Sequence, residues 1–371
     1  MKPRNFTVDL ARGFVVFIMP ATHVTLYYST QSVQEGIWGT LLKCIAEGAG
    51  AQVFMFLLGF SFYLGREKTL SIIIKRGISI FLLAYLLNFF KFVLPGFLGI
   101  IPNSFYTYYG LEKGLFALID MLMVGDIFQF AGISYIICGL IYKCKSNWLL
   151  PVGISLLITL ISPFIWGIRL PNFLLDYTLK LLNGYPPAVF FPFFPWIVYP
   201  LLGLGLGKFY LSCNNEQKFY QYFLKAGIVC IVIGIIIMQF EPNSFNYTFY
   251  RLGPGGSIFH IGLVLLWLRL CYWASIRLCG SRTIIALFQW CSSNITTIYV
   301  FQWLIISWML PHYGFMTRSL PDTLLAVMTV TLLTHALAAI TYLFLRKKRG
   351  HFNKGDHNIS LQVPKNLNNN T

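Results

Sequence analysis

One stretch near the start of the chain places an acid, a base and an imidazole along one stripe of a predicted helix. Asp9, Arg12 and His23 fall in or beside the first long apolar run. On an ideal helix Arg12 and His23 lie within about 20° of each other, and Asp9 lies about one step round. Such side chains are costly in hydrocarbon unless they face protein or a wet cavity. We therefore expect the stripe to line a functional site.

His23 and Asp9 are the candidate catalytic residues. A buried imidazole accepts a proton near neutral pH, which suits a general base. Pro20, three residues before His23, frees one backbone carbonyl and loosens the helix there. Asp9 and Arg12 are three residues apart and can form an ion pair. Two alternatives remain open: a histidine that only packs between helices, and an Asp9–Arg12 pair that only sets topology and caps the helix.

Other polar residues are candidates for binding. Arginine suits a phosphate group, and four arginines are expected on the inner side, where they would bind the phosphates of a cofactor or would only fix topology: Arg12, Arg66, Arg76 and Arg282. Three residues are candidates for binding a substrate: Gln129, Trp196 and His260. Asp120 and Asp126 are six residues apart and lie on different helix faces, so they do not suggest an acid–base pair.

The composition indicates an integral membrane protein. Of 371 residues, 57% are hydrophobic and 11% are charged, whereas about 25% are charged in a typical soluble domain. We predict an all-α polytopic fold of about ten transmembrane helices. The apolar runs are Leu10–Tyr28, Ala46–Leu64, Ile72–Leu94, Leu115–Tyr142, Trp148–Trp166, Val189–Tyr210, Phe223–Phe240, Ile258–Ile276, Ile284–Leu310 and Leu324–Leu345. Most Lys and Arg residues fall in alternate loops, which predicts that both termini are cytoplasmic.

The remaining features exclude several classes of site. The net charge of +16 is spread between apolar runs, so we expect contact with membrane lipids and no nucleic acid. The eight cysteines form no CxxC pattern, which predicts no metal site. The glycines at 203, 205 and 207 lie inside an apolar run and favour close helix packing over a nucleotide loop.

We divide the chain into a membrane domain, residues 1–349, and a polar, disordered cytoplasmic tail, residues 350–371.

Four stretches, taken in order, resemble one family of membrane enzymes, the heparan-α-glucosaminide N-acetyltransferase-like acyltransferases, in a bacterial-type form. They are Val8-Asp-Leu-Ala-Arg-Gly13 with Met19 and His23, Ala51–Gly59, Gly125–Tyr135 and Phe193–Gly207. The resemblance implies transfer of an acyl group, usually acetyl, from cytoplasmic acyl-CoA to a sugar on the far side. It also implies that a histidine is the key residue, and His23 fits that position. The heparan-modifying branch carries a histidine after the first span, and Ser29–Glu47 contains none, which leaves the acceptor open.

We therefore expect an acyltransferase in the bacterial inner membrane, and the resemblance implies that the acyl group is acetyl. Acetyl-CoA would be the co-substrate, and a carbohydrate or glycan would be the acceptor. The sequence does not decide whether the acyl group goes to oxygen or to nitrogen, or whether the protein forms a homodimer. One alternative is a transporter or flippase for a glycan or lipid-linked substrate, since intramembrane charges and broken spans serve transport too. Another is a partner subunit of a cell-envelope complex without chemistry of its own.

Overall fold

The structure is a computed structural model that describes residues 4–184, 189–242, 245 and 248–352. Within these residues the chain forms helices and no strand, which confirms the all-α class. The helices are α1 (Phe6–Tyr28), α2 (Gln31–Glu35), α3 (Ile37–Ile45), η1 (Ala46–Gly50), α4 (Ala51–Leu64), α5 (Leu70–Asn88), η2 (Phe89–Val93), α6 (Leu94–Phe97), α7 (Asn103–Tyr108), α8 (Leu115–Leu122), α9 (Ile127–Lys143), α10 (Leu149–Ile165), α11 (Phe173–Asn183), α12 (Phe193–Trp196), α13 (Val198–Ser212), α14 (Glu216–Phe240), α15 (Pro254–Leu278), α16 (Arg282–Ser293), α17 (Ile295–Trp308), α18 (Leu310–Tyr313) and α19 (Leu320–Phe352).

Each of the ten predicted apolar runs coincides with helix, but several are broken. Six helical segments of the described chain are long and apolar enough to cross a membrane, and a seventh is obtained if α16 and α17, bent by 73°, count as one span. The runs around α8–α9 and α12–α13 divide into shorter helices, and α10 has 17 residues. The chain is thus a multi-pass membrane protein, and the number of about ten stays a prediction.

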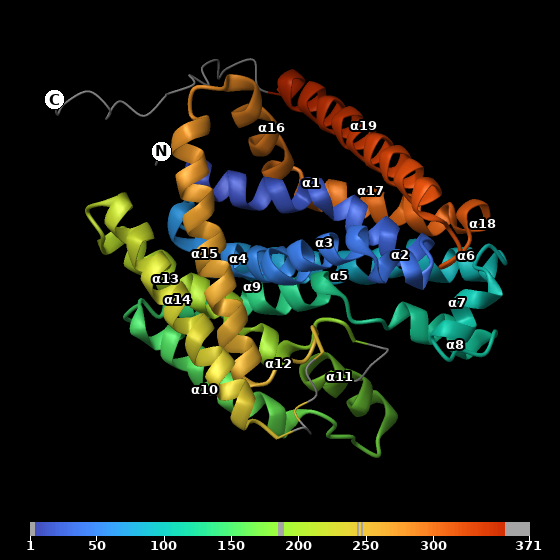
Figure 1. The fold of residues 1–371 in the computed structure, drawn as a ribbon, viewed down its shortest axis with the longest axis horizontal. Coiled ribbons are helices and arrows are strands. Elements are labelled where there is room, and N and C mark those ends of the chain that lie inside the picture. Colours follow the sequence, from blue (N-terminus) through green and yellow to red (C-terminus); the bar gives the residue numbers. More distant parts are fainter. Residues whose placement is uncertain (1–3, 185–188, 243–244, 246–247, 353–371) are drawn as a thin grey trace.

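Helix α1 lies at the centre of the arrangement. Asn5 caps it by accepting a hydrogen bond from the Val8 amide, and the helix packs on α4, α15, α16, α17 and α19. Figure 1 shows α1, α4, α5 and α9 running in similar directions, whereas α14 and α15 cross one end of the molecule steeply. Gly13 lets α16 approach, because a Cβ there would lie 2.5 Å from the Phe288 carbonyl oxygen. Residues of α1 can therefore meet partners from most of the chain.

Glycines also bring α4 and α13 together, as the spacing of Gly203 and Gly207 predicts. A Cβ on Gly207 would lie 2.8 Å from the Phe60 carbonyl oxygen, and the backbone of Phe56 lies closer still to Gly203. This confirms close helix packing as the reason for those glycines.

The first and last helices of the described chain share one end of the molecule. The first turn of α1 and the last described turn of α19 lie at the same end of the molecule, beside α16 (Figure 1). An even number of crossings has this result. Helix α19 continues to Phe352, past the expected domain boundary at residue 349, and residues 353–371 of the predicted tail lie outside the described residues.

Three breaks in the helices determine where polar side chains can meet. A π-helical turn, η2, interrupts the span that begins with α5, a short connection separates α8 from α9, and Asn294 separates α16 from α17. Breaks of this kind are tolerated in a membrane where neighbouring protein satisfies the freed backbone groups. All three lie near charged or amide side chains that the next section describes.

Candidate active site

An ion pair buried among the helices forms the centre of the site. Lys91, in η2, places its Nζ 3.2 Å from Oδ2 of Asp126, the residue immediately before α9. The two side chains are 2% and 12% exposed. A charge at this depth is tolerated only when it has a partner. With His23, Tyr299 and Gln302, the pair makes up what we call the buried polar cluster.

The backbone of α9 holds Asp126 in place. Asp126 is the N-cap, and its Oδ1 accepts a hydrogen bond of 2.7 Å from the Ile127 amide. Gln129 completes a capping box: its Oε1 accepts from the Asp126 amide at 3.0 Å, and its Nε2 donates to the Val124 carbonyl at 2.9 Å. The structure thus uses the amide of Gln129, a predicted substrate ligand, to fix Asp126.

Helix α17 contacts both members of the ion pair. The Tyr299 hydroxyl donates to Oδ2 of Asp126 at 3.2 Å. The Lys91 ammonium lies 3.8 Å from the ring centroid of Trp303, a cation–π contact. The ammonium also lies 4.5 Å from the ring centroid of Phe92, so Lys91 has one carboxylate and two aromatic faces as partners.

His23 reaches the same aromatic side chain from α1. Its ring centroid lies 4.4 Å from that of Trp303, and its Nδ1 lies 3.0 Å from the amide nitrogen of Gln302. Because the amide can turn, this contact fits either tautomer of the imidazole. His23 and Lys91 thus lie against the same indole, so an imidazole and a fixed positive charge are close neighbours.

At the start of α1, Asp9 and Arg12 have different partners from those expected. Asp9 pairs with Arg4, whose Nη2 lies 2.9 Å from Oδ1, and accepts a hydrogen bond of 2.8 Å from Ser292 in α16. Arg12 donates to Ser61 in α4 at 3.0 Å. The predicted Asp9–Arg12 ion pair is therefore wrong, because each side chain reaches a neighbouring segment instead. Asp9 also lies about 21 Å along α1 from His23, so the structure does not bring the two candidate catalytic residues together.

Several positive side chains gather where α4 ends and α5 begins. Arg76 is exposed, stacks 5.3 Å from the Tyr135 ring centroid and is within electrostatic range of Arg12 and Lys68. Burial, followed by the charge of Arg76, lowers the pKa of Lys68. Arg66 is exposed beside Lys68. We call Arg12, Lys68 and Arg76 the inner cation cluster, after the side of the membrane on which the sequence predicts them. Arg282, the remaining predicted phosphate ligand, is exposed at the first turn of α16.

The other two predicted substrate ligands lie outside the buried polar cluster. Trp196 is fully buried, and its indole N–H donates to the Tyr250 carbonyl at 3.0 Å. His260 places Nδ1 2.8 Å from the Gly256 carbonyl oxygen and lines a separate groove on α15. Sequence reasoning did not select Lys91, Asp126, Tyr299 or Gln302. The sequence did offer one signal: Lys91 and Asp126 lie inside or beside apolar runs, where each charge needs a partner.

Within the part of the chain that the structure describes, no three His, Cys, Asp or Glu side chains come together as metal ligands would.

A comparison with family models gives a match to the catalytic region of heparan-alpha-glucosaminide N-acetyltransferase, over residues 4–235. No curated protein matches the chain. The matched residues include α1, the inner cation cluster, Lys91 and Asp126, whereas α17 lies beyond them.

Proposed function

Because the chain belongs to the heparan-alpha-glucosaminide N-acetyltransferase catalytic family, a family of membrane acetyltransferases, we propose that it moves an acetyl group from cytoplasmic acetyl-CoA to a carbohydrate on the other side of the membrane. The observation that carries this proposal is the pairing of an imidazole and a buried ammonium on one indole, His23 and Lys91 against Trp303. Such a pair supplies a base and a charge that stabilises an oxyanion.

His23 acts first in the proposed reaction. With the amide oxygen of Gln302 turned toward Nδ1, the ring proton stays on Nδ1 and Nε2 is free to accept another. Nε2 takes the proton of the acceptor hydroxyl or amine as the acceptor attacks the thioester carbonyl. The new carbon–oxygen or carbon–nitrogen bond forms, the carbon–sulfur bond breaks, and His23 returns the proton to the CoA thiolate.

Lys91 stabilises the charge that develops during this attack. Its ammonium is fixed by Asp126, which in turn is fixed by Tyr299 and the start of α9. A positive group held in place before the reaction stabilises the carbonyl oxygen without reorganising. In this proposal Lys91 contacts the reacting oxygen, whereas Asp126 and Tyr299 are positioning residues.

The inner cation cluster binds the phosphates of the donor. Arg12 donates only to a hydroxyl and a carbonyl among the described residues. Arg76 is within electrostatic range of Arg12, and Lys68 is within electrostatic range of Arg76. Arg12 and His23 are about 16 Å apart along α1. The pantetheine arm would extend over this distance, so that the phosphates stay at the inner end while the thioester reaches the buried polar cluster. Holding both reactants in this way lowers the entropic barrier.

Two measurements test the proposal. Acetylation of envelope glycans is compared by mass spectrometry in cells with the gene, without it, and with His23→Ala; we expect the acetyl groups to disappear in the second and third. Acetyl-CoA should also raise the melting temperature of the purified protein, because a ligand that binds only the folded state stabilises it. Unchanged acetylation without the gene, or no shift with acetyl-CoA, would favour a transporter instead.

A further inference from the structure

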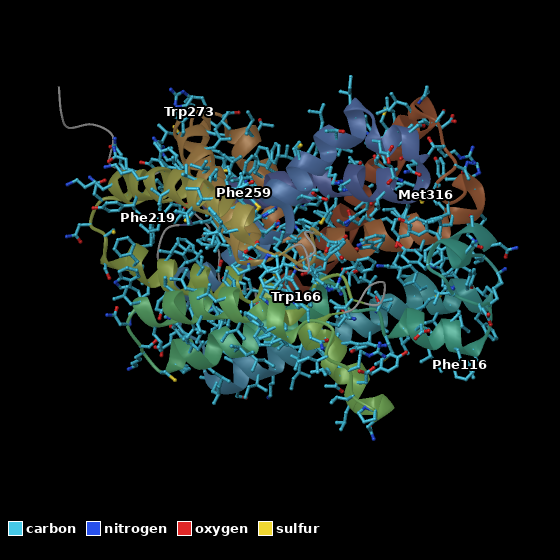
Figure 2. The ribbon with its side chains drawn as sticks, turned by 60° about the horizontal axis from the view of Figure 1, so that its bottom comes forward. Phe116, Trp166, Phe219, Phe259, Trp273 and Met316 are labelled. Atoms are coloured by element: carbon cyan, nitrogen blue, oxygen red, sulfur yellow. The ribbon has the colours of Figure 1, made fainter. Side chains whose placement is uncertain are left out.

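A groove of about 1070 Å³ runs along α15, outside the buried polar cluster. Its floor is formed by α15 between Phe259 and Trp273. Its walls include Leu224 of α14 and four residues of α3 and η1, namely Cys44, Ile45, Glu47 and Gly48. Figure 2 labels Phe259 and Trp273, which both lie on α15. The two residues are fourteen positions apart, about 21 Å along the helix.

The groove opens to the side on which lipid lies. Leu270, Trp273 and Leu224 line it and are 50%, 46% and 40% exposed. Since α14 and α15 are both candidate membrane spans, these exposed apolar side chains face hydrocarbon. A hydrocarbon chain is the occupant that matches such a wall.

One positive charge lies within this apolar lining. Arg269 lies about 4.5 Å past the middle of α15, and its guanidinium carbon is 5.6 Å from the Tyr272 ring centroid, one turn nearer the Leu278 end. In the described part of the chain Arg269 has no ion pair, and its buried Nε has no hydrogen-bond partner. The buried Nε1 of Trp267 also lacks one there. The acid in the lining is Glu47, and Lys43 lies 3.9 Å from its carboxylate.

We propose that this groove binds an anionic phospholipid, with the phosphate on Arg269 and an acyl chain along the leucines of α15. A cation inside an apolar wall needs an anion, and a lipid phosphate is the anion that arrives with a hydrocarbon chain attached. Two unpartnered N–H groups, on Arg269 and Trp267, provide donors for phosphate and ester oxygens. The proposal does not depend on acetyl transfer, because no residue of the groove belongs to the buried polar cluster.

Quenching of tryptophan fluorescence by brominated lipid tests this proposal directly, because Trp267 and Trp273 line the groove. The full-length protein is reconstituted in phosphatidylcholine vesicles that contain a minor fraction of brominated phosphatidylglycerol or, in parallel, brominated phosphatidylcholine. We expect the wild type to prefer the anionic probe by about fivefold, the factor that one basic residue contributes near an anionic lipid surface. Trp267→Phe should remove a large part of the quenching.

Substitutions locate the effect. Arg269→Gln should abolish the preference for the anionic probe, and Arg269→Lys should keep it. Lys225→Gln is the matched control, since Lys225 is exposed and adjoins Leu224 but does not line the groove; it should leave the preference unchanged. Equal quenching by the two probes in the wild type, or a preference that survives Arg269→Gln, would overturn the proposal.

Discussion

Lys91 and Asp126 are 35 residues apart in the chain and meet as a buried ion pair of 3.2 Å. The contact joins the π-helical turn η2 to the N-cap residue of α9. It fixes a positive charge beside the aromatic face that His23 also contacts. The proposed reaction depends on this junction, because the junction holds the Lys91 ammonium in place.

Breaking the pair on one side should destabilise the protein strongly. Lys91→Met leaves the carboxylate of Asp126 buried without its cation, and we expect a loss of about 3–5 kcal/mol in the free energy of unfolding. The measurement is the denaturation of purified protein in detergent.

The double variant Lys91→Met with Asp126→Asn is the control. Asparagine keeps the helix cap and carries no charge, so the double variant should recover much of the loss. A double variant that is destabilised by the sum of the two single effects would show that the two side chains do not act as a pair.

Removing a cation at the inner end of α1 should weaken donor binding and leave the chemical step intact. For Arg12→Gln we expect KM for acetyl-CoA to rise about tenfold or more, the effect of losing one charged hydrogen bond, with kcat little changed. Arg76→Gln should act in the same direction. Initial rates at varied acetyl-CoA concentration test this.

The control for this prediction is Lys225→Gln, an exposed cation on another helix, which should leave KM unchanged. If kcat falls while KM stays constant in Arg12→Gln, the arginine acts on the chemistry and the inner cation cluster is not a phosphate site.

Because of Lys68, the affinity for acetyl-CoA should depend on pH in the alkaline range. Burial and Arg76 lower its pKa in the free protein, and a bound phosphate would raise that pKa by favouring the ammonium. Between the two values binding takes up a proton, so the affinity for acetyl-CoA should fall as pH rises through this window. Calorimetric titrations at several pH values measure it.

Lys68→Met should bind acetyl-CoA more weakly than the wild type at neutral pH and should lose this alkaline dependence. An identical pH profile in wild type and Lys68→Met would show that Lys68 does not contact the donor.

Much of the fold could be predicted from the sequence because hydrocarbon imposes simple rules. Apolar runs had to become helices, and Gly203 and Gly207 had to allow a close helix contact. The number of uninterrupted spans could not be predicted in the same way. Runs such as Ile284–Leu310 contain a 73° bend, and only the surrounding protein makes such a break tolerable.

The site was predictable in part for the same reason. His23 could be selected because it lies on the same predicted helix as Asp9 and Arg12, and helical periodicity predicts which face of that helix it occupies. Its partners Lys91 and Gln302 come from η2 and α17, and their meeting depends on where those helices break. Spacing along one helix did not predict the partner of Asp9. Arg12 is three residues away on the same helix, yet Asp9 pairs with Arg4.

His23 is the base of the proposed reaction, and a kinetic comparison of two histidine variants tests this role. His23→Ala should lower kcat/KM for acetyl transfer by about 10²–10⁴-fold, the usual contribution of a general base, while the protein remains folded and binds acetyl-CoA. His312→Ala, at an exposed histidine outside the buried polar cluster, should keep wild-type activity. A folded His23→Ala protein that transfers acetyl groups at the wild-type rate would show that His23 is not the base.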